Sequence, residues 1–127
     1  MKIEVFGSQK SYRLLQKFEF TSDRKKMSVV IQDEVTGLII LYSKGADLAI
    51  FDRLSTQIEQ HFLEATKEDL IKFSTKGFRT LCFALRVLDE AYFNEWQLKY
   101  EAAKLEAIKQ GVNKVATKAM GHKLDAN

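Results

Sequence analysis

Hydrophobic and polar residues alternate along the first third of the chain in the way that β-strands require. The segment YRLLQKFEF (residues 12–20) places Leu14 and every second residue after it on one side, and it predicts a strand that ends at an aromatic ring. The runs MSVVIQD (27–33) and LIILYS (38–43) enclose a short turn, so they predict a β-hairpin. Gly37 is expected at the turn position that favours a positive φ.

The apolar spacing changes to that of helices after the hairpin. A short helix is expected to begin near Asp47, and a second helix, with a capping-like start at Thr66, is expected to stop at Gly77. The apolar run RTLCFALRVL (79–88) is interpreted as a buried strand, although periodicity alone leaves a helix open. Asp89 is predicted to cap a long final helix.

The final helix is expected to carry an apolar face that continues for about seven turns of ~3.6 residues. Trp96 and Tyr100, four residues apart, are expected to anchor its first half to the sheet, and Gly111 is a candidate interruption. The residues expected on the apolar face are Leu98, Ala102, Leu105, Ile108, Val112, Val115 and Ala119. Together these elements predict an α+β fold, a twisted antiparallel sheet flanked by helices.

Size and composition narrow the class of protein. A chain of 127 residues favours one domain, and the formal charge of +3 is too balanced to require a nucleic-acid partner or direct contact with an anionic membrane. The longest apolar stretch, LIILY (38–42), is too short to cross a bilayer, and the N-terminus carries no secretory signal, so we expect a soluble cytosolic chain. The single cysteine, Cys82, is expected to be a buried, unreactive thiol.

Two short segments, FTSDRKKMSVV (20–30) and YSKGAD (42–47), carry the candidate chemistry. Adenine is a flat apolar ring attached to a polyanionic tail, so a nucleotide site needs an aromatic face and a cation, which Phe20 and Lys44 supply. Taken alone, Phe20 is better explained as a core residue, and the charged run after it as a solvated turn. Lys44 is the stronger signal, because the small residues after it and the expected helix start favour an anion.

Other candidate residues carry weaker signals. Arg79 opens the last predicted strand, where a structural salt bridge is as plausible as a ligand contact. The lysines of the C-terminal part spread around the helix and are best explained as a solvated face. His61 and His122 have no partner at ligand spacing, so a metal site has almost no support. Neither GxxxxGK[ST] nor GxGxxG occurs, so nucleotide binding should be weak and led by the adenine.

Three segments in this order, FTSDRKKMSVV, YSKGAD and KGFRTLCFALRVL, resemble the nucleotide-binding domain of P-type ATPases. The resemblance covers about residues 12–103, and the Asp after KGA, where cation pumps usually have Pro and Glu, is similar to the phospholipid flippase branch. The resemblance implies that Phe20 stacks on adenine and that Lys44 and Arg79 contact the nucleotide. Residues implied to line the pocket less directly are Thr21, Met27 and Gly45.

The resemblance also implies that other domains, which this sequence does not contain, carry out part of the reaction. In the family, this domain presents ATP so that its γ-phosphate reaches an aspartate of a separate phosphorylation domain, with Mg²⁺ bridging the phosphates. The DKTGT motif that carries the aspartate, the TGE motif and transmembrane segments are absent, so this chain alone is not expected to turn over ATP. The implied partners are ATP and the phosphorylation and transmembrane domains of the parent protein, at the cytosolic face of a membrane.

The resemblance is incomplete at both ends of the sequence. The acidic motif upstream of the first strand, usually DE followed by Ala and Leu, is missing, so one pocket wall and some strands are expected to lie outside this chain. We interpret residues 1–127 as a single nucleotide-binding domain fragment, in which residues 104–127 form a C-terminal helical extension. The sequence does not identify the transported lipid.

A second class of function remains open at this point. The long apolar helix face after Asp89 also suits a non-catalytic interaction module that docks a partner helix, with the basic turn at residues 24–26 as an accessory. RNA binding through that turn ranks last, because the charges are few and the nearby aromatic residues are expected inside the fold.

Overall fold

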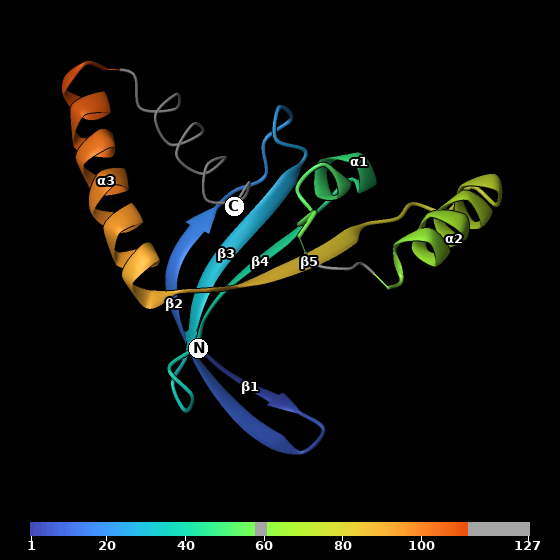
Figure 1. Cartoon of the computed structure of the whole chain (residues 1–127), viewed down its shortest axis with the longest axis horizontal. Coiled ribbons are helices and arrows are strands. Elements are labelled where there is room, and N and C mark those ends of the chain that lie inside the picture. The colour runs from blue at the N-terminus through green and yellow to red at the C-terminus, as the bar shows by residue number, and fades with distance from the viewer. Residues whose placement is uncertain (58–60, 112–127) are drawn as a thin grey trace.

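Five antiparallel strands form the centre of the structure, a computed structural model that describes residues 1–57 and 61–111. The strands lie in the sheet in the order β1-β2-β3-β4-β5, with helices beside them (Figure 1). The elements are β1 (Lys2–Val5), β2 (Ser8–Phe18), β3 (Lys26–Asp33), β4 (Ile39–Gly45), α1 (Asp47–Phe51), α2 (Leu63–Thr75), β5 (Cys82–Leu88) and α3 (Glu90–Lys109). The predicted α+β fold with an antiparallel sheet is confirmed.

Strand β2 is longer than the sequence pattern predicted, and it begins in a hairpin that the pattern did not reveal. It pairs first with β1 and then, from Tyr12 onward, with β3. A β-bulge between Leu14 and Gln16 shifts the register, so Leu15 packs against the core while Leu14 is 54% exposed. The prediction that Leu14 shares a face with Gln16 and Phe18 was therefore wrong, and the strand ends at Phe18, two residues earlier than expected.

The predicted hairpin is confirmed as β3 and β4. Gly37 closes its turn with a φ of 74°, the left-handed conformation that glycine adopts without strain. The carboxylate of Asp33 accepts hydrogen bonds from the N–H groups of Thr36 (3.1 Å) and Val35 (2.8 Å). These bonds stabilise the ionised carboxylate, so they hold the pKa of Asp33 below its ordinary value.

Helix α3 covers one face of the sheet, and Asp89 caps it as predicted. The Asp89 carboxylate accepts a hydrogen bond from the N–H of Tyr92 at 3.1 Å. Trp96 and Tyr100 stack with ring centroids 5.0 Å apart, and both meet the ring of Phe18 edge-on, so the predicted anchoring is confirmed. The core cluster consists of Phe18, Val30, Ile39, Leu41, Leu88, Phe93, Trp96 and Tyr100.

The apolar face predicted for the final helix does not pack against the sheet. Leu98, Leu105 and Ile108 are 75%, 60% and 52% exposed. The prediction was wrong because aromatic side chains, also at helical spacing, bury more apolar surface than the aliphatic stripe. The buried stripe consists of Phe93, Trp96, Tyr100 and Ala107. The helix ends at Lys109, before Gly111. Outside the described residues lie the other predicted members, Val112, Val115 and Ala119.

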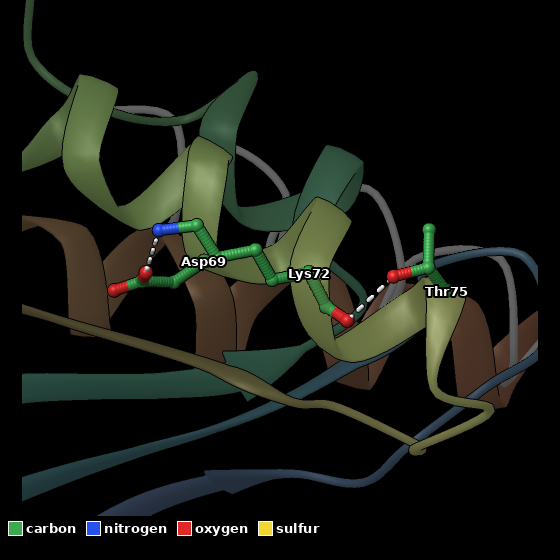
Figure 2. Close-up of polar contacts among 3 residues, drawn as sticks. All are labelled: Asp69, Lys72 and Thr75. Carbon is green, nitrogen blue, oxygen red and sulfur yellow. Dashed lines mark hydrogen bonds and ion pairs between the residues drawn. The ribbon is translucent and has the colours of Figure 1, made fainter.

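Helix α2 stands away from the sheet and buries none of its side chains. In Figure 1 it projects beyond the start of β5. The polar contacts in Figure 2 stay within the helix: Lys72 Nζ lies 3.3 Å from Asp69 Oδ1, and the Thr75 hydroxyl donates to the Lys72 carbonyl at 2.8 Å. The helix begins at Leu63, so the predicted start at Thr66 was wrong, and the N–H of Thr66 already donates to a carbonyl four residues earlier.

Gly77 stops α2, as predicted. Its φ is 77°, and the N–H groups of Gly77 and Phe78 donate to the carbonyls of Ser74 (2.9 Å) and Phe73 (3.0 Å). This pair of bonds is the Schellman arrangement, which satisfies the last carbonyls of a helix. The rings of Phe73 and Phe78 lie 6.3 Å apart and complete the motif with an apolar contact.

Strand β5 confirms the strand interpretation of RTLCFALRVL, although it begins only at Cys82. The expectation that the strand is buried was half wrong. Cys82 and Leu88 are buried, whereas Phe83, Leu85 and Val87 are 72%, 62% and 53% exposed. The reason is that β5 lies at the edge of the described sheet, and only the face that it shares with α3 joins the core.

Candidate functional site

Phe20 lies on the surface of the molecule. Its side chain is 61% exposed, whereas Phe18, two residues earlier, is 2% exposed in the core. Strand alternation would bury both rings, but β2 ends at Phe18 and the regular alternation ends with it. The core interpretation of Phe20, which the residue alone favoured, is therefore wrong, and its ring is accessible to a ligand.

The loop that follows β2 is held by a buried arginine. Arg24 is 5% exposed and donates to the carbonyl of Glu19 (3.1 Å) and to the hydroxyl of Ser28 (3.3 Å). Its guanidinium also lies 5.7 Å from the centre of the Phe18 ring, within the range of a cation–π contact. The arginine therefore fixes the loop to the core rather than presenting its charge to solvent.

The same loop is tied to the end of β4. The N–H of Lys25 donates to the carbonyl of Thr21 at 2.8 Å, and the Lys25 carbonyl accepts from the N–H of Ala46 at 3.0 Å. Since Ala46 belongs to the segment YSKGAD, the two candidate segments lie side by side. Lys26, the first residue of β3, is 1% exposed, so the predicted solvated turn was wrong at Lys26 as well as at Arg24.

Gly45 permits this close approach. A Cβ atom at Gly45 would lie 2.4 Å from the carbonyl oxygen of Lys25 and 2.6 Å from the Cβ of Lys26. Gly45 is itself buried, so the neighbouring strand occupies the space that the sequence analysis reserved for a ligand. Its contribution to a ligand pocket stays a prediction, and its observed role is to let β3 and β4 approach.

Lys44 lies on the face of the sheet that α3 leaves uncovered. The cross-strand register puts Met27 of β3 and Phe83 of β5 directly beside it, so the three side chains point to the same face. Lys44 is exposed, and none of the described residues forms an ion pair with its ammonium group. We call this surface the open face, and its rows across β3, β4 and β5 consist of Met27, Val29, Ile31, Ile40, Tyr42, Lys44, Phe83, Leu85 and Val87, of which Ile31 is buried.

Arg79 lies in the exposed segment between α2 and β5. Three residues along the chain from it, Cys82 pairs with Gly45, so the Cα atom of Arg79 lies within about 11 Å of that of Cys82. Within residues 1–57 and 61–111, no acidic group forms an ion pair with the guanidinium. The structural salt bridge weighed for Arg79 therefore finds no support in this part of the chain.

The antiparallel topology brings the predicted residues to one end of the sheet. Strands β2 and β4 end there, and β3 and β5 begin there, because successive strands run in opposite directions. Phe20 follows the last residue of β2, and Met27 is the second residue of β3. Lys44 is the penultimate residue of β4, and Arg79 precedes β5. We call this part of the sheet the Lys44 end. The aromatic ring of Phe20 and the cationic side chains of Lys44 and Arg79 belong to residues at this end.

Two hollows border β5. The first, of about 590 Å³, lies between α1, α2 and the start of the strand. The second, of about 720 Å³, lies against β3, β4, β5 and the segment after α1. Phe83 lines both, whereas Phe20, Lys44 and Arg79 line neither. The predicted residues therefore belong to an open surface and not to either hollow.

Sequence reasoning missed Phe83 as a candidate because the whole run RTLCFALRVL was interpreted as buried. The alternation within β5 was the signal that could have found it, since Cys82 and Phe83 point to opposite faces. Cys82 is buried as predicted, and desolvation raises the pKa of its thiol, which disfavours the reactive thiolate. Cys82 is thus a core residue, whereas the aromatic ring of its neighbour Phe83 is accessible.

Two other kinds of feature were searched for in the described part of the chain. No three His, Cys, Asp or Glu residues of residues 1–57 and 61–111 gather in a way that could hold a metal ion. Of the helices described, none combines the length and apolar character needed to cross a bilayer.

Comparisons with known proteins agree with the resemblance. The family model described as P-type ATPase, cytoplasmic domain N, matches residues 1–121. The phospholipid-transporting ATPase C4F10.16c of Schizosaccharomyces pombe is 46% identical over 101 residues, which are 80% of this chain and 7% of the relative. The phospholipid-transporting ATPase tat-1 of Caenorhabditis elegans is 43% identical over 100 residues, 78% of this chain and 9% of the relative. The probable phospholipid-transporting ATPase IM of Homo sapiens is 42% identical over 101 residues, 80% of this chain and 8% of the relative.

The chain thus spans less than a tenth of the length of these relatives. The predicted extension over residues 104–127 lies mostly outside the described residues, so that division of the chain stays a prediction. The interaction-module alternative gains no support from the comparisons. The family match and these identities show that the chain belongs to the cytoplasmic N domains of the P-type ATPases, and that it is similar to those of phospholipid-transporting members.

Proposed function

We propose that this chain is the ATP-binding domain of a phospholipid-translocating P-type ATPase, at the cytosolic face of a membrane. Its task is to present ATP to the phosphorylation domain of the parent protein, which works with the transmembrane domain. The observation that carries the proposal is the position of Lys44, an exposed lysine of the open face, at the same end of the sheet as the exposed ring of Phe20. The family match and the names of the relatives support it.

Each side chain of the Lys44 end supplies one part of nucleotide recognition. The ring of Phe20 offers a stacking surface for adenine, which is worth roughly 1–3 kcal/mol per base. The ammonium of Lys44 is a compact charge for a phosphate oxygen, and the guanidinium of Arg79 can hold two such oxygens at once. Thr21, Met27 and Gly45 contribute indirectly, since Gly45 sets the strand spacing and the N–H of Lys25 bonds to the Thr21 carbonyl.

In this proposal, magnesium is bound by the phosphate groups of ATP rather than by this domain alone. Mg²⁺ prefers oxygen ligands, and the described residues offer no cluster of three carboxylate, thiol or imidazole groups for it. Bound to the phosphates, the ion would neutralise part of their negative charge. The side chains of the Lys44 end bind and orient the nucleotide, and the transfer of its γ-phosphate is left to the phosphorylation domain of the parent protein.

An ATP titration followed by amide NMR shifts tests the proposal. We expect Phe20→Ala to weaken ATP binding roughly 5- to 150-fold, the effect of removing one stacking partner. Lys44→Glu should also weaken ATP binding, because it replaces an attractive charge with a repulsive one. Both variants should retain the parent chain's midpoint of urea denaturation, since both side chains are exposed.

Matched controls separate the site from general surface effects. Phe6→Ala removes the same ring from a fully exposed position in the β1–β2 turn, and Lys17→Glu reverses a charge on β2. Neither should change the ATP dissociation constant by more than about twofold. If Phe20→Ala and Lys44→Glu bind ATP as well as the parent chain, the assignment of the site is wrong.

A further inference from the structure

A cross-strand row of three side chains crosses the open face at the level of Lys44. Met27 pairs with Lys44, and Lys44 pairs with Phe83. Residues directly opposite each other in an antiparallel sheet have Cβ atoms roughly 4.5–5.5 Å apart, so the Phe83 ring begins beside the lysine side chain. The ring is 72% exposed, more than either Leu85 or Val87, the other members of β5 on this face.

We propose that Phe83 is a specificity-determining residue that contacts the adenosine part of the nucleotide beside Lys44. This inference rests on the proposed function, since it names a further residue of the same site. Phe83 supplies an apolar, aromatic contact to the base or ribose, while Lys44 serves the phosphates. The site then has two aromatic residues and a cation: Phe20 from the loop after β2, Lys44 from β4 and Phe83 from β5.

The place of Phe83 relative to Arg79 supports this role. Phe83 is the fourth residue after Arg79, so their Cα atoms lie within about 14 Å of each other. Phe83 thus lies beside Lys44 across the strands and a few residues after Arg79 in the chain. A ligand that contacts both cations would lie close to this ring.

The plain alternative is that Phe83 belongs to an apolar surface that is covered by other parts of a longer protein, like its neighbours on the strand. That alternative treats Phe83 and Val87 alike, because both are exposed members of the same face of β5. Val87 lies opposite Ile40, four residues or about 13 Å along β4 from Lys44, so it does not adjoin the lysine as Phe83 does. Val87→Ala is therefore a matched control for Phe83→Ala.

The test compares ATP with adenosine by NMR titration of the full chain. We expect Phe83→Ala to weaken both ligands by the same factor, roughly 5-fold or more, because the lost contact is to the part that they share. Lys44→Glu should weaken ATP alone, and Val87→Ala should leave both ligands within about twofold of the parent chain. Phe83→Tyr should retain most of the affinity, because it keeps the ring.

The outcomes separate this inference from the proposed function. If Phe20→Ala and Lys44→Glu weaken ATP binding but Phe83→Ala does not differ from Val87→Ala, the inference about Phe83 is wrong and the proposed function stands. A Phe83→Ala effect on ATP but not on adenosine, or a Phe83→Tyr variant as weak as Phe83→Ala, also overturns it. If the parent chain shows no response to ATP, both fail together.

Discussion

At the scale of single residues, Phe18 and Phe20 are identical side chains with opposite surroundings. The ring of Phe18 meets Trp96 and Tyr100 edge-on at centroid distances of 5.9 Å, whereas the ring of Phe20 lies in solvent. Because a ring stabilises a fold through the apolar area that it removes from water, only Phe18 contributes to the core. Phe18 therefore contributes to the stability of the fold, whereas the exposed ring of Phe20 is free to contribute to ligand binding.

Alanine substitution should expose this difference. We expect Phe18→Ala to lower the free energy of unfolding by about 3–5 kcal/mol, the usual effect of emptying a buried aromatic site. Phe20→Ala should change it by less than about 0.5 kcal/mol, as for an ordinary surface substitution. Urea denaturation followed by far-UV circular dichroism measures both values. A loss of several kcal/mol for Phe20→Ala would mean that its ring is part of the core in solution.

Contacts of individual residues were the least predictable from the sequence. Lys44 was identified from its neighbours in the chain, and it is exposed as a ligand contact requires. The burial of Arg24 and Lys26 was missed, because a run of charges looks solvated when read locally. Their environment depends on other strands, because the Arg24 guanidinium lies 5.7 Å from the centre of the Phe18 ring of β2 and Lys26 pairs with Gly45 of β4. Local polarity carries no information about such partners.

At the scale of elements, the β3–β4 hairpin connects the two candidate segments. Its turn depends on the carboxylate of Asp33, which accepts hydrogen bonds from the N–H groups of Val35 and Thr36. Gly37 completes the turn with its positive φ. The conformation of the turn therefore depends on the negative charge of the Asp33 side chain.

Acid should loosen this turn. The pKa of Asp33 in the folded chain lies below its ordinary value, chiefly because of the hydrogen bonds from Thr36 and Val35. The stabilising contribution of the carboxylate is therefore fully present above the pKa of the unfolded chain and is lost as the pH falls through the folded pKa. Carboxyl-carbon NMR titration should give Asp33 a pKa below about 3.9, and Asp33→Ala should remove the pH dependence of the turn amides. An ordinary or raised pKa would contradict the observed hydrogen bonds.

Element types followed from the sequence more readily than element boundaries. Asp89 and Gly77 were placed correctly because cap residues act on the backbone beside them. The start of α2 was misplaced, since Thr66 has the residue type of a cap but lies inside the helix. The bulge at Leu15 was also missed, because an extra residue in one strand is defined only by its partner strand.

At the scale of the whole molecule, the sheet has one covered face and one uncovered face. Helix α3 packs its aromatic residues onto the first, and the second is the open face, on which Phe83, Leu85 and Val87 are exposed. Exposed apolar side chains on an edge strand favour association with other chains. The same feature that leaves Lys44 accessible therefore makes the isolated chain prone to self-association.

Sedimentation velocity over a range of concentrations tests this consequence. We expect the chain to associate as its concentration rises, and Leu85→Lys with Val87→Lys to reduce association by placing charge on the edge strand. Leu98→Lys is the matched control, because Leu98 is 75% exposed on α3, away from the sheet. If Leu98→Lys alone prevents association, the outer stripe of α3 is the contact surface, as the interaction-module hypothesis expects.

The arrangement of the whole chain was predicted in part. The hairpin and the alternation of strands were sufficient to expect an antiparallel sheet, and the resemblance joined Phe20, Lys44 and Arg79 in one hypothesis. Their position at one end of the sheet follows from strand direction once the strand order is known. The open face could not be predicted, because an apolar run such as RTLCFALRVL does not reveal which of its faces is covered.

The Lys44 end is assembled from strands that lie far apart in the sequence. Its first strand is complete at Phe18, but its last strand begins only at Cys82. Contacts of such long sequence separation form late, because the intervening loop entropy has to be overcome first. A nascent chain emerging from the ribosome therefore acquires this surface only after β5 has been synthesised, and under the proposed function its binding of nucleotide has to wait for that strand.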